Sequence, residues 1–243
     1  MLGMLLSIIT ITKDDPAGLA RTLDSASAWR SCDGVEQIVI YAGAEPTIEA
    51  DGVVSIHRQA STGISTAFNE GLERARGDWV WFVNGGDAIH ETADPVWLTA
   101  HLRGTKAGLV VGLIQFDGES GPRPMPGLRD QWPLIACWLP HQATLIRRDL
   151  IRAAGGFEPR WRVAMDYDLW HRMIKACTPV DVLSIVLARF AVDGISEAAP
   201  TVALKWREDA AVVRRYSLPM LGYVLRLNLK LGWRLARAFS RWL

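Results

Sequence analysis

Residues 61–87, STGISTAFNEGLERARGDWVWFVNGGD, decide the fold of this 243-residue chain. Apolar residues at positions 64, 67, 68, 71, 72 and 75 have the spacing of one face of an amphipathic helix. Gly77 is predicted to end that helix in the left-handed conformation. An apolar strand over residues 79–83 follows and ends in the polar turn Asn84-Gly85-Gly86-Asp87. The stretch therefore predicts a helix, a buried strand and a carboxylate at the end of that strand.

Strands and helices alternate on both sides of this stretch. Residues 5–12 form a near-continuous apolar and β-branched run, typical of a buried parallel strand. Asp15 followed by Pro16 predicts the start of a helix. The remaining expected elements are strands at 37–42, 53–57, 108–116, 143–147 and 180–190, and helices at 149–154 and 166–177. This order favours an α/β sheet with helices on both faces, whose ligands bind beyond the carboxyl ends of the strands.

Composition and charge exclude several classes of protein. The chain is 49% hydrophobic and 22% charged, which is typical of a globular protein and not of a disordered or coiled-coil one. The widely spaced Cys32, Cys137 and Cys177 predict no zinc site or disulfide framework and favour a reduced, cytoplasmic protein. A net charge of +1 indicates no nucleic-acid partner. There is no signal-peptide pattern, no apolar stretch of ~18 residues, no GxGxxG after the first strand and no P-loop.

Three polar motifs are candidates for a site. The glycines before Asp87 suit close approach to phosphates, and its carboxylate suits Mg²⁺ or Mn²⁺. Asp166 opens a helix, where the dipole favours a carboxylate, and Asp168 and Arg172 are spaced for an ion pair. His141, at the start of a strand, is suited to binding a phosphate or orienting an acceptor. Taken alone, each motif is better explained by a structural role: a tight turn, a helix cap with a surface ion pair, and an ordinary polar residue, respectively.

The order of four blocks carries more information than any one of them. These blocks are LLSIITITKDDPAGLARTLDS (5–25), residues 61–87, LPHQATLIRRDLIRAAGGFEP (139–159) and AMDYDLWHRM (164–173). In this order they resemble the nucleotide-sugar glycosyltransferases of family 2, and the resemblance covers about residues 5–190. It implies the GT-A fold, which is a Rossmann-like, mixed and mostly parallel sheet flanked by helices.

The resemblance also implies roles for individual residues. Asp87 corresponds to the aspartate that binds a divalent metal, Mg²⁺ or Mn²⁺, and Asp166 to the catalytic base of an inverting transfer. Arg172 closes the helix motif and orients the site. His141 and Gln142 correspond to a pair near the donor diphosphate or the acceptor. The residues expected to bind the nucleotide sugar are Thr10, Tyr41, Asn69, Asn84, Gly85 and Gly86.

Three features depart from the family pattern. Tyr41 stands where relatives usually carry an aspartate that reads the nucleotide base, and Thr66 where a second aspartate is common. Asn84 and Gly85 stand where many relatives carry an acidic residue. The alternative function is therefore a catalytically degenerate, glycosyltransferase-like binding or scaffold protein.

The C-terminal residues have a pattern of their own. We expect a glycosyltransferase domain over 1–204 and a basic amphipathic helical extension over 205–243. A helical stripe of Arg226, Lys230, Arg234, Arg237 and Arg241 beside Leu, Phe and Trp suits an anionic membrane surface. Packing against the domain or a partner is the alternative. The expected acceptor is a glycan or a lipid-linked sugar in cell-surface polysaccharide synthesis, at the inner face of the cytoplasmic membrane.

Overall fold

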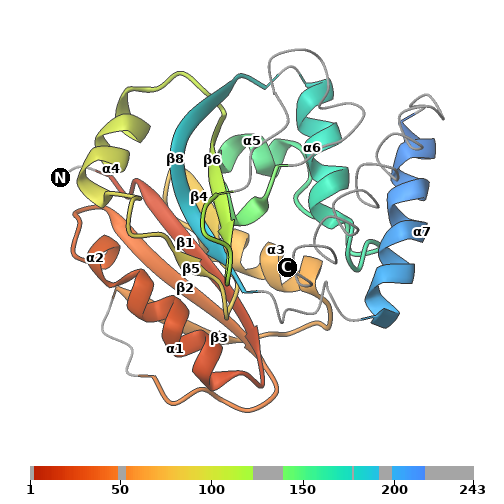
Figure 1. The fold of residues 1–243 in the computed structure, drawn as a ribbon, viewed down its shortest axis with the longest axis horizontal. Helices are drawn as coiled ribbons and strands as arrows, with labels where there is room; N and C mark the ends of the chain where they lie inside the picture. Colours follow the sequence, from red (N-terminus) through yellow and green to blue (C-terminus); the bar gives the residue numbers. More distant parts are fainter. Residues whose placement is uncertain (1–2, 49–52, 123–138, 177, 192–198, 217–243) are drawn as a thin grey trace.

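The computed structural model describes residues 3–48, 53–122, 139–176, 178–191 and 199–216 (Figure 1). Within these residues the strands form one eight-stranded sheet in the order β3-β2-β1-β4-β7-β6-β8-β5. The strands are β1 (Leu6–Lys13), β2 (Val35–Ala42), β3 (Val54–Arg58), β4 (Trp79–Phe82), β5 (Ala88–Ile89), β6 (Leu109–Phe116), β7 (Thr144–Arg147) and β8 (Val180–Phe190). The helices are α1 (Pro16–Ser25), α2 (Ser27–Arg30), α3 (Ile64–Arg74), α4 (Pro95–Gly104), α5 (Arg148–Ala153), α6 (Met165–Lys175) and α7 (Ala199–Arg215).

The sheet is mixed and mostly parallel, as the sequence predicts. β1 pairs in parallel with β2 and β4, β2 with β3, and β6 with β8. β7 runs antiparallel to both β4 and β6, and the short β5 runs antiparallel to β8. The carboxyl ends of β1, β2 and β4 therefore lie at one edge, where β4 continues into the turn that carries Asp87.

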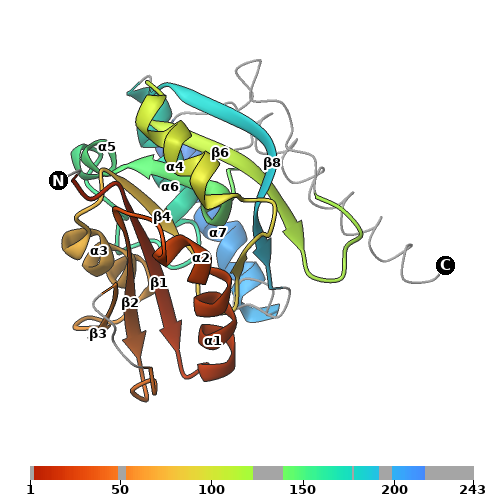
Figure 2. The same ribbon diagram turned by 90° about the vertical axis from the view of Figure 1, so that its left-hand side faces the viewer.

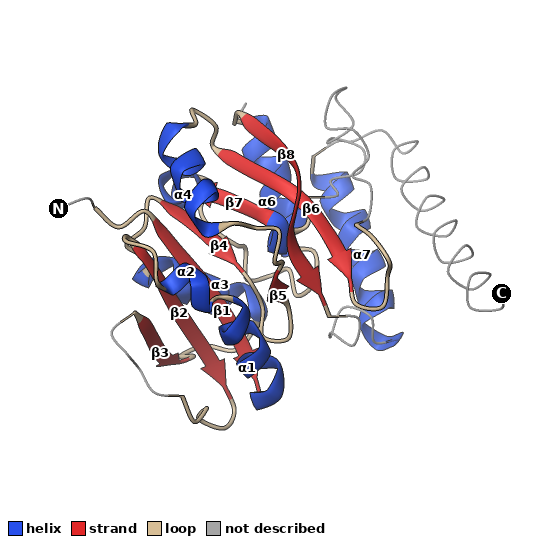
Figure 3. Cartoon of the chain, turned by 60° about the vertical axis from the view of Figure 1, so that its left-hand side comes forward, coloured by secondary structure: helices blue, strands red, loops and turns tan. Residues whose placement is uncertain are grey.

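Helices cover both faces of the sheet. On one face, α3, α5 and α6 pack on apolar residues of β1, β2 and β4, including Ile9, Ile38 and Phe82, and α7 packs against α6. On the other face lie α1, α2 and α4, which bury residues such as Leu19, Trp29 and Leu98. Figure 2 shows α1 and α3 on opposite sides of β1 and β2, and Figure 3 shows α4 and α6 on opposite sides of the sheet. The expectation of helices on both faces is confirmed.

The role predicted for Gly77 is wrong. The helix α3 ends at Arg74, Ala75 is extended, and Gly77 does not have a positive φ. A Cβ atom at Gly77 would lie 2.6 Å from backbone atoms of Leu6 and Ser7. Glycine is needed here because the chain passes close to β1, and not because the helix ends in the left-handed conformation.

Helix α7 crosses the boundary predicted between residues 204 and 205 without a break. Its Val212 and Val213 are buried in the core, so residues up to 216 pack with the main domain. The basic stripe of residues 226–241 lies outside the described residues. Across the ranges that the structure describes, no helix has the length and apolar character to cross a bilayer.

Candidate active site

The turn that carries Asp87 is held in place by α1 and β1. The Thr22 hydroxyl accepts from the Gly86 amide at 3.0 Å and lies 2.6 Å from the Asp87 carbonyl, to which it donates. The Arg21 Nε donates to the Gly86 carbonyl at 3.0 Å. Gly86 has a φ of 103°, and a Cβ at Gly85 would lie 2.9 Å from the Thr12 hydroxyl, so both positions favour glycine.

The carboxylate of Asp87 is buried and bound by two neutral donors. It is 4% exposed. Its Oδ1 accepts from the Ala191 amide at 3.0 Å, and its Oδ2 accepts from the Gln142 Nε2 at 3.1 Å. Burial raises the pKa of Asp87 to about 6, although the hydrogen bonds and the nearby His141 act to lower it. A desolvated carboxylate of this kind is stabilised by any cation that reaches it.

His141 links the Asp87 turn to α6. The Asn84 Nδ2, which is a donor only, lies 3.1 Å from the His141 Nε2. Nε2 therefore accepts, and the ring proton lies on Nδ1. Nδ1 is 3.5 Å from the Asp166 Oδ2, and the ring packs against Phe68 with 5.6 Å between ring centroids. His141 thus directs an N–H group toward Asp166.

Asp166 lies in the first turn of α6 with about a quarter of its side chain exposed. Its Oδ1 accepts from the Tyr167 amide at 2.7 Å. Burial alone would raise the pKa of Asp166, but the hydrogen bond from His141 and the charge of Lys205 outweigh it and lower the pKa to about 2. The group is therefore ionised at any physiological pH and remains open to solvent on one side.

These contacts bring the two predicted carboxylates to one site. Gln142 contacts Asp87, and the adjacent His141 contacts Asp166. The Trp81 Nε1 fixes this pair by donating to the Gln142 carbonyl at 2.7 Å. Sequence reasoning placed Asp87, Asp166, His141 and Gln142 near one another and missed Thr22, Lys205 and Arg21. No local pattern in the sequence distinguishes those three residues.

Arg172 and Asn69 lie close to the site but are engaged with a neighbouring loop. The predicted ion pair is present, with the Arg172 Nε 2.9 Å from the Asp168 Oδ2. The same guanidinium donates to the carbonyls of Ala154 and Gly156. Asn69 exchanges two hydrogen bonds with the backbone of Phe157, at 2.7 and 2.9 Å. Both side chains therefore position the loop after α5.

Thr10 and Tyr41 are buried rather than displayed at the strand ends. Thr10 is fully buried, and its hydroxyl accepts from the Gln37 Nε2 at 3.2 Å. Tyr41 is 4% exposed, and the Arg58 guanidinium lies 5.0 Å from the centre of its ring. Both side chains therefore pack within the sheet layers, and their role in nucleotide binding stays a prediction.

The residues of the Asp87 turn fit a divalent cation. The Asn84 Oδ1 is buried and has no hydrogen-bond partner, and it belongs to the same turn as the desolvated Asp87 carboxylate. Carboxylate and amide oxygens are ligands that Mg²⁺ and Mn²⁺ take, with phosphates and water in the remaining positions. Among the described residues, no group of three His, Cys, Asp or Glu side chains forms a metal cage of its own.

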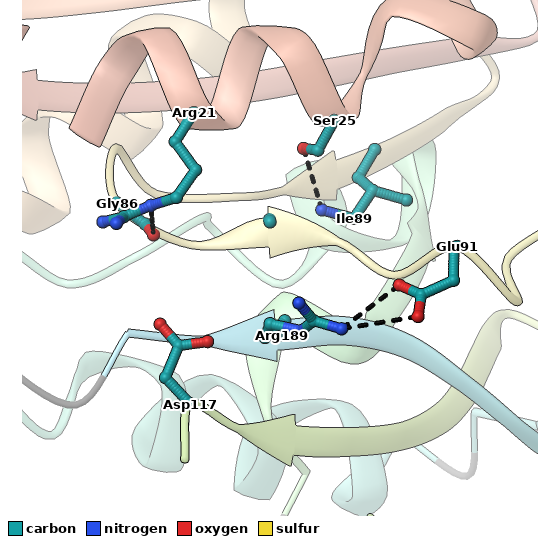
Figure 4. Close-up of a pocket in the computed structure, with 8 residues that line it drawn as sticks. Arg21, Ser25, Gly86, Ile89, Glu91, Asp117 and Arg189 are labelled. Carbon is teal, nitrogen blue, oxygen red and sulfur yellow. Dashed lines mark hydrogen bonds and ion pairs between the residues drawn. The ribbon is translucent and has the colours of Figure 1, made fainter. Parts of the chain in front are cut away.

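A separate pocket of about 230 Å³ lies behind the same turn (Figure 4). Residues from α1, the turn, β5 and the ends of β6 and β8 line it: Arg21, Ser25, Gly86, Ala88, Ile89, Glu91, Asp117 and Arg189. Gln142, His141 and Asp166 do not line it. Arg21 and Gly86 belong both to this pocket and to the Asp87 turn, and the charge of Asp117 makes a minor contribution to the raised pKa of Asp87.

A mixed, mostly parallel sheet flanked by helices, with polar side chains gathered at the carboxyl ends of its parallel strands, is the arrangement of the GT-A fold. The family model "Glycosyl transferase family 2" matches residues 7–151, which is more than half of the chain. The chain therefore belongs to glycosyltransferase family 2. The match includes Asp87 and His141 and ends before Asp166.

Relatives of known sequence agree with this assignment. An uncharacterized glycosyltransferase of Mycobacterium tuberculosis is 27% identical over 204 residues, covering 78% of this chain and 76% of the relative. A glycosyltransferase of PGL/p-HBAD biosynthesis from Mycobacterium bovis is 27% identical over 183 residues, covering 69% of each chain.

Solved structures share the fold. Staphylococcus aureus TarS 1–349 in complex with UDP-GlcNAc superposes with a TM-score of 0.68 at 15% identity, covering 93% of this chain and 72% of that one. The mannosyltransferase PcManGT of Pyrobaculum calidifontis, in complex with GDP-Man and Mn²⁺, gives 0.59 at 14% identity, covering 87% and 65%. The chain spans between 37% and 72% of the TarS structures that it matches. The predicted fold class is confirmed.

Proposed function

We propose that this protein is an inverting glycosyltransferase that moves a sugar from a nucleoside-diphosphate sugar to a hydroxyl of a glycan or lipid-linked acceptor. The observation that carries the proposal is the continuous contact from Asp87 through Gln142 and His141 to Asp166. It joins a desolvated carboxylate suited to a cation with an ionised carboxylate suited to accepting a proton. The structural neighbours bound to UDP-GlcNAc and to GDP-Man with Mn²⁺ support the class of donor.

On the donor side, Asp87 and Asn84 would hold the divalent cation. When bound, the cation supplies Lewis-acid neutralisation of the charge that develops on the leaving diphosphate. The chain's own part is to present the two oxygens in a turn that Thr22 and Arg21 keep fixed. Asn84 also donates to His141, so the same residue couples the donor side to the acceptor side.

On the acceptor side, Asp166 accepts the proton of the attacking hydroxyl. The hydroxyl oxygen forms a bond to C1 of the sugar while the bond from C1 to the diphosphate oxygen breaks. Attack from the face opposite the diphosphate inverts the configuration and needs no covalent intermediate. The His141 Nδ1–H holds one carboxylate oxygen during this step, and general-base assistance of this kind contributes ~10²–10⁴-fold.

The experiment that tests the proposal first identifies the donor. Thermal shifts are measured with nucleoside diphosphates and their sugars, with and without Mn²⁺, and release of the nucleoside diphosphate is then assayed with the stabilising donor. We expect metal-dependent stabilisation by one nucleotide series and turnover of its sugar. Binding without any turnover would favour the alternative, a degenerate binding or scaffold protein, which the non-acidic Tyr41, Thr66 and Asn84 motivate.

We propose in addition that the basic C-terminal residues bind an anionic membrane surface. The support is the sequence pattern of residues 226–241, together with the relative named for PGL/p-HBAD biosynthesis. A chain ending at Tyr216 keeps α7 and removes the stripe. It should lose flotation with anionic liposomes, whereas the intact chain should float with them. Equal flotation of the two chains would contradict membrane binding through this segment.

A further inference from the structure

Helix α7 places a buried carboxylate directly behind the start of α6. Glu208 is 7% exposed. Its Oε1 accepts from the Arg162 amide at 2.9 Å. Its Oε2 accepts from the amides of Val163 and Ala164 at 2.8 and 2.9 Å. One side chain therefore binds three consecutive backbone N–H groups.

These three amides belong to the segment that leads into α6. A helix leaves its first N–H groups without partners in the helix, and a negative charge at that end is favourable. The Ala164 carbonyl already accepts from the Asp168 amide at 3.0 Å, so Ala164 belongs to the first turn of hydrogen bonds. Glu208 acts as a cap supplied by another helix, and Asp166 lies only two residues beyond Ala164.

Helix α7 is itself fixed against α6, which lies beside it (Figure 1). The Asp168 carboxylate is fully buried and lies 3.0 Å from both the Arg215 Nη1 and the Tyr216 hydroxyl. Arg215 also pairs with Glu158 at 2.6 Å. Two separate connections, through Glu208 and through Asp168, therefore tie α7 to the element that carries Asp166.

The position of Asp166 is sensitive to this connection. The Nδ1 of His141 and the Oδ2 of Asp166 are 3.5 Å apart, at the outer limit of a hydrogen bond. A shift of the segment 162–164 by a fraction of an ångström would break this contact. We propose that Glu208 is a positioning residue, which holds the start of α6 so that Asp166 faces His141 and the acceptor hydroxyl. The proposal rests on the proposed function of Asp166 as the base.

The test compares Glu208→Gln with Glu36→Gln. Glu36 is a matched control because it is 5% exposed and accepts from the Arg76 amide and the Ser7 hydroxyl, in a region away from the site. Displacements of about 1 Å cost on the order of 10²-fold in rate. For Glu208→Gln we expect kcat to fall by about that factor with the donor KM unchanged. Glu36→Gln should keep the wild-type kcat, and Glu208→Asp, which keeps the charge, should recover part of the rate.

Hydrogen exchange gives a readout that does not depend on turnover. In Glu208→Gln the amides of residues 162–164 should lose protection, whereas in Glu36→Gln they should keep it. A wild-type kcat in Glu208→Gln, or unchanged protection of these amides, overturns the proposal. If Glu208→Gln does not fold, Glu208→Asp is measured in its place, and a reduced kcat with unchanged protection of these amides overturns the proposal. Wild-type turnover in Asp166→Asn would instead refute the role of Asp166 as the base. This result distinguishes failure of the proposed function from failure of the proposal for Glu208.

Discussion

The Asp87 turn and the start of α6 each hold a carboxylate, but they surround it differently. Neutral donors from Ala191 and Gln142 face Asp87, and burial raises its pKa to about 6. His141 and Lys205 face Asp166, and together they lower its pKa to about 2 against the effect of burial. The first carboxylate is contacted by neutral donors and would be stabilised by a bound cation, whereas the second already has a positive charge near it within the chain. The two aspartates of this site therefore have opposite pKa shifts, upward for Asp87 and downward for Asp166.

Replacing Asp166 should have the largest effect, and the effect should be on turnover. Asp166→Asn keeps the size of the side chain and removes its ability to accept a proton, so turnover should fall by ~10²–10⁴-fold. Donor affinity should stay unchanged, because the donor side is built from the Asp87 turn. Isothermal titration with the donor and Mn²⁺, beside a turnover assay, measures both. Loss of donor binding in this variant would show that the two regions are not separate in function.

Asp168, a neighbouring carboxylate on α6, is expected to contribute to the stability of the fold and not to the reaction. Asp168 is fully buried and contacts Arg172, Arg215 and Tyr216. Asp168→Ala removes a buried carboxylate that accepts charged hydrogen bonds from the partly exposed Arg172 and Arg215, and should lower the free energy of unfolding by about 1.5–3 kcal/mol. Denaturant titration measures this loss. A variant that is as stable as the wild type would mean that the α6–α7 contact is not held by this cluster.

Replacing Asp87 should raise stability, in contrast to the loss expected for Asp168→Ala. The pKa of Asp87 in the folded chain, about 6, lies above its ordinary value of 3.8. Ionisation therefore costs stability as the pH rises from about 4 to about 6, and the cost persists above that range. In EDTA at pH 7.5, Asp87→Asn should be more stable than the wild type by up to ~3 kcal/mol, and this gain should vanish near pH 4.

The same variant should lose its response to Mn²⁺. Thermal shifts of the wild type with Mn²⁺ and a nucleoside diphosphate should weaken below pH 6, because protonation of Asp87 would neutralise the carboxylate proposed to bind the metal. Asp87→Asn should show no metal-dependent shift at any pH. A shift of wild-type size in the variant would place the cation elsewhere in the molecule.

The smallest effect is expected for Thr22, whose hydroxyl supports the Asp87 turn. Thr22→Val removes the hydroxyl that bonds the backbone of the Asp87 turn, and the lost hydrogen bonds should cost about 1 kcal/mol of stability. The affinity for Mn²⁺ and donor should fall as well. Thr99→Val is a matched control, since the Thr99 hydroxyl is buried and bonds a carbonyl within α4. Equal Mn²⁺ affinity in the two variants would contradict a role of Thr22 in holding the turn.

Local patterns were sufficient to predict the positions of both carboxylates and of seven of the eight strands in the described residues, the two-residue β5 being the exception. An apolar strand ending in Asn-Gly-Gly-Asp and a helix opening with an aspartate can be recognised from adjacent residues alone. The surroundings of the two groups could not be predicted in this way. Glu208 contacts amides 44 to 46 positions earlier in the chain, and no spacing rule links such residues. Thr10 was expected to line a pocket, but its side chain is fully buried and its hydroxyl accepts from Gln37, 27 positions later in the chain.

The attachment of α7 restricts how this enzyme can be recombined with its relatives. The family model ends at residue 151, a natural point at which to join sequences when building chimaeras. A hybrid that takes its C-terminal part from another protein would need partners equivalent to Glu208 and Arg215 for the segment 162–168. Exchange of residues 152–216 as one cassette should preserve these partners, whereas a junction placed between α6 and α7 should separate them.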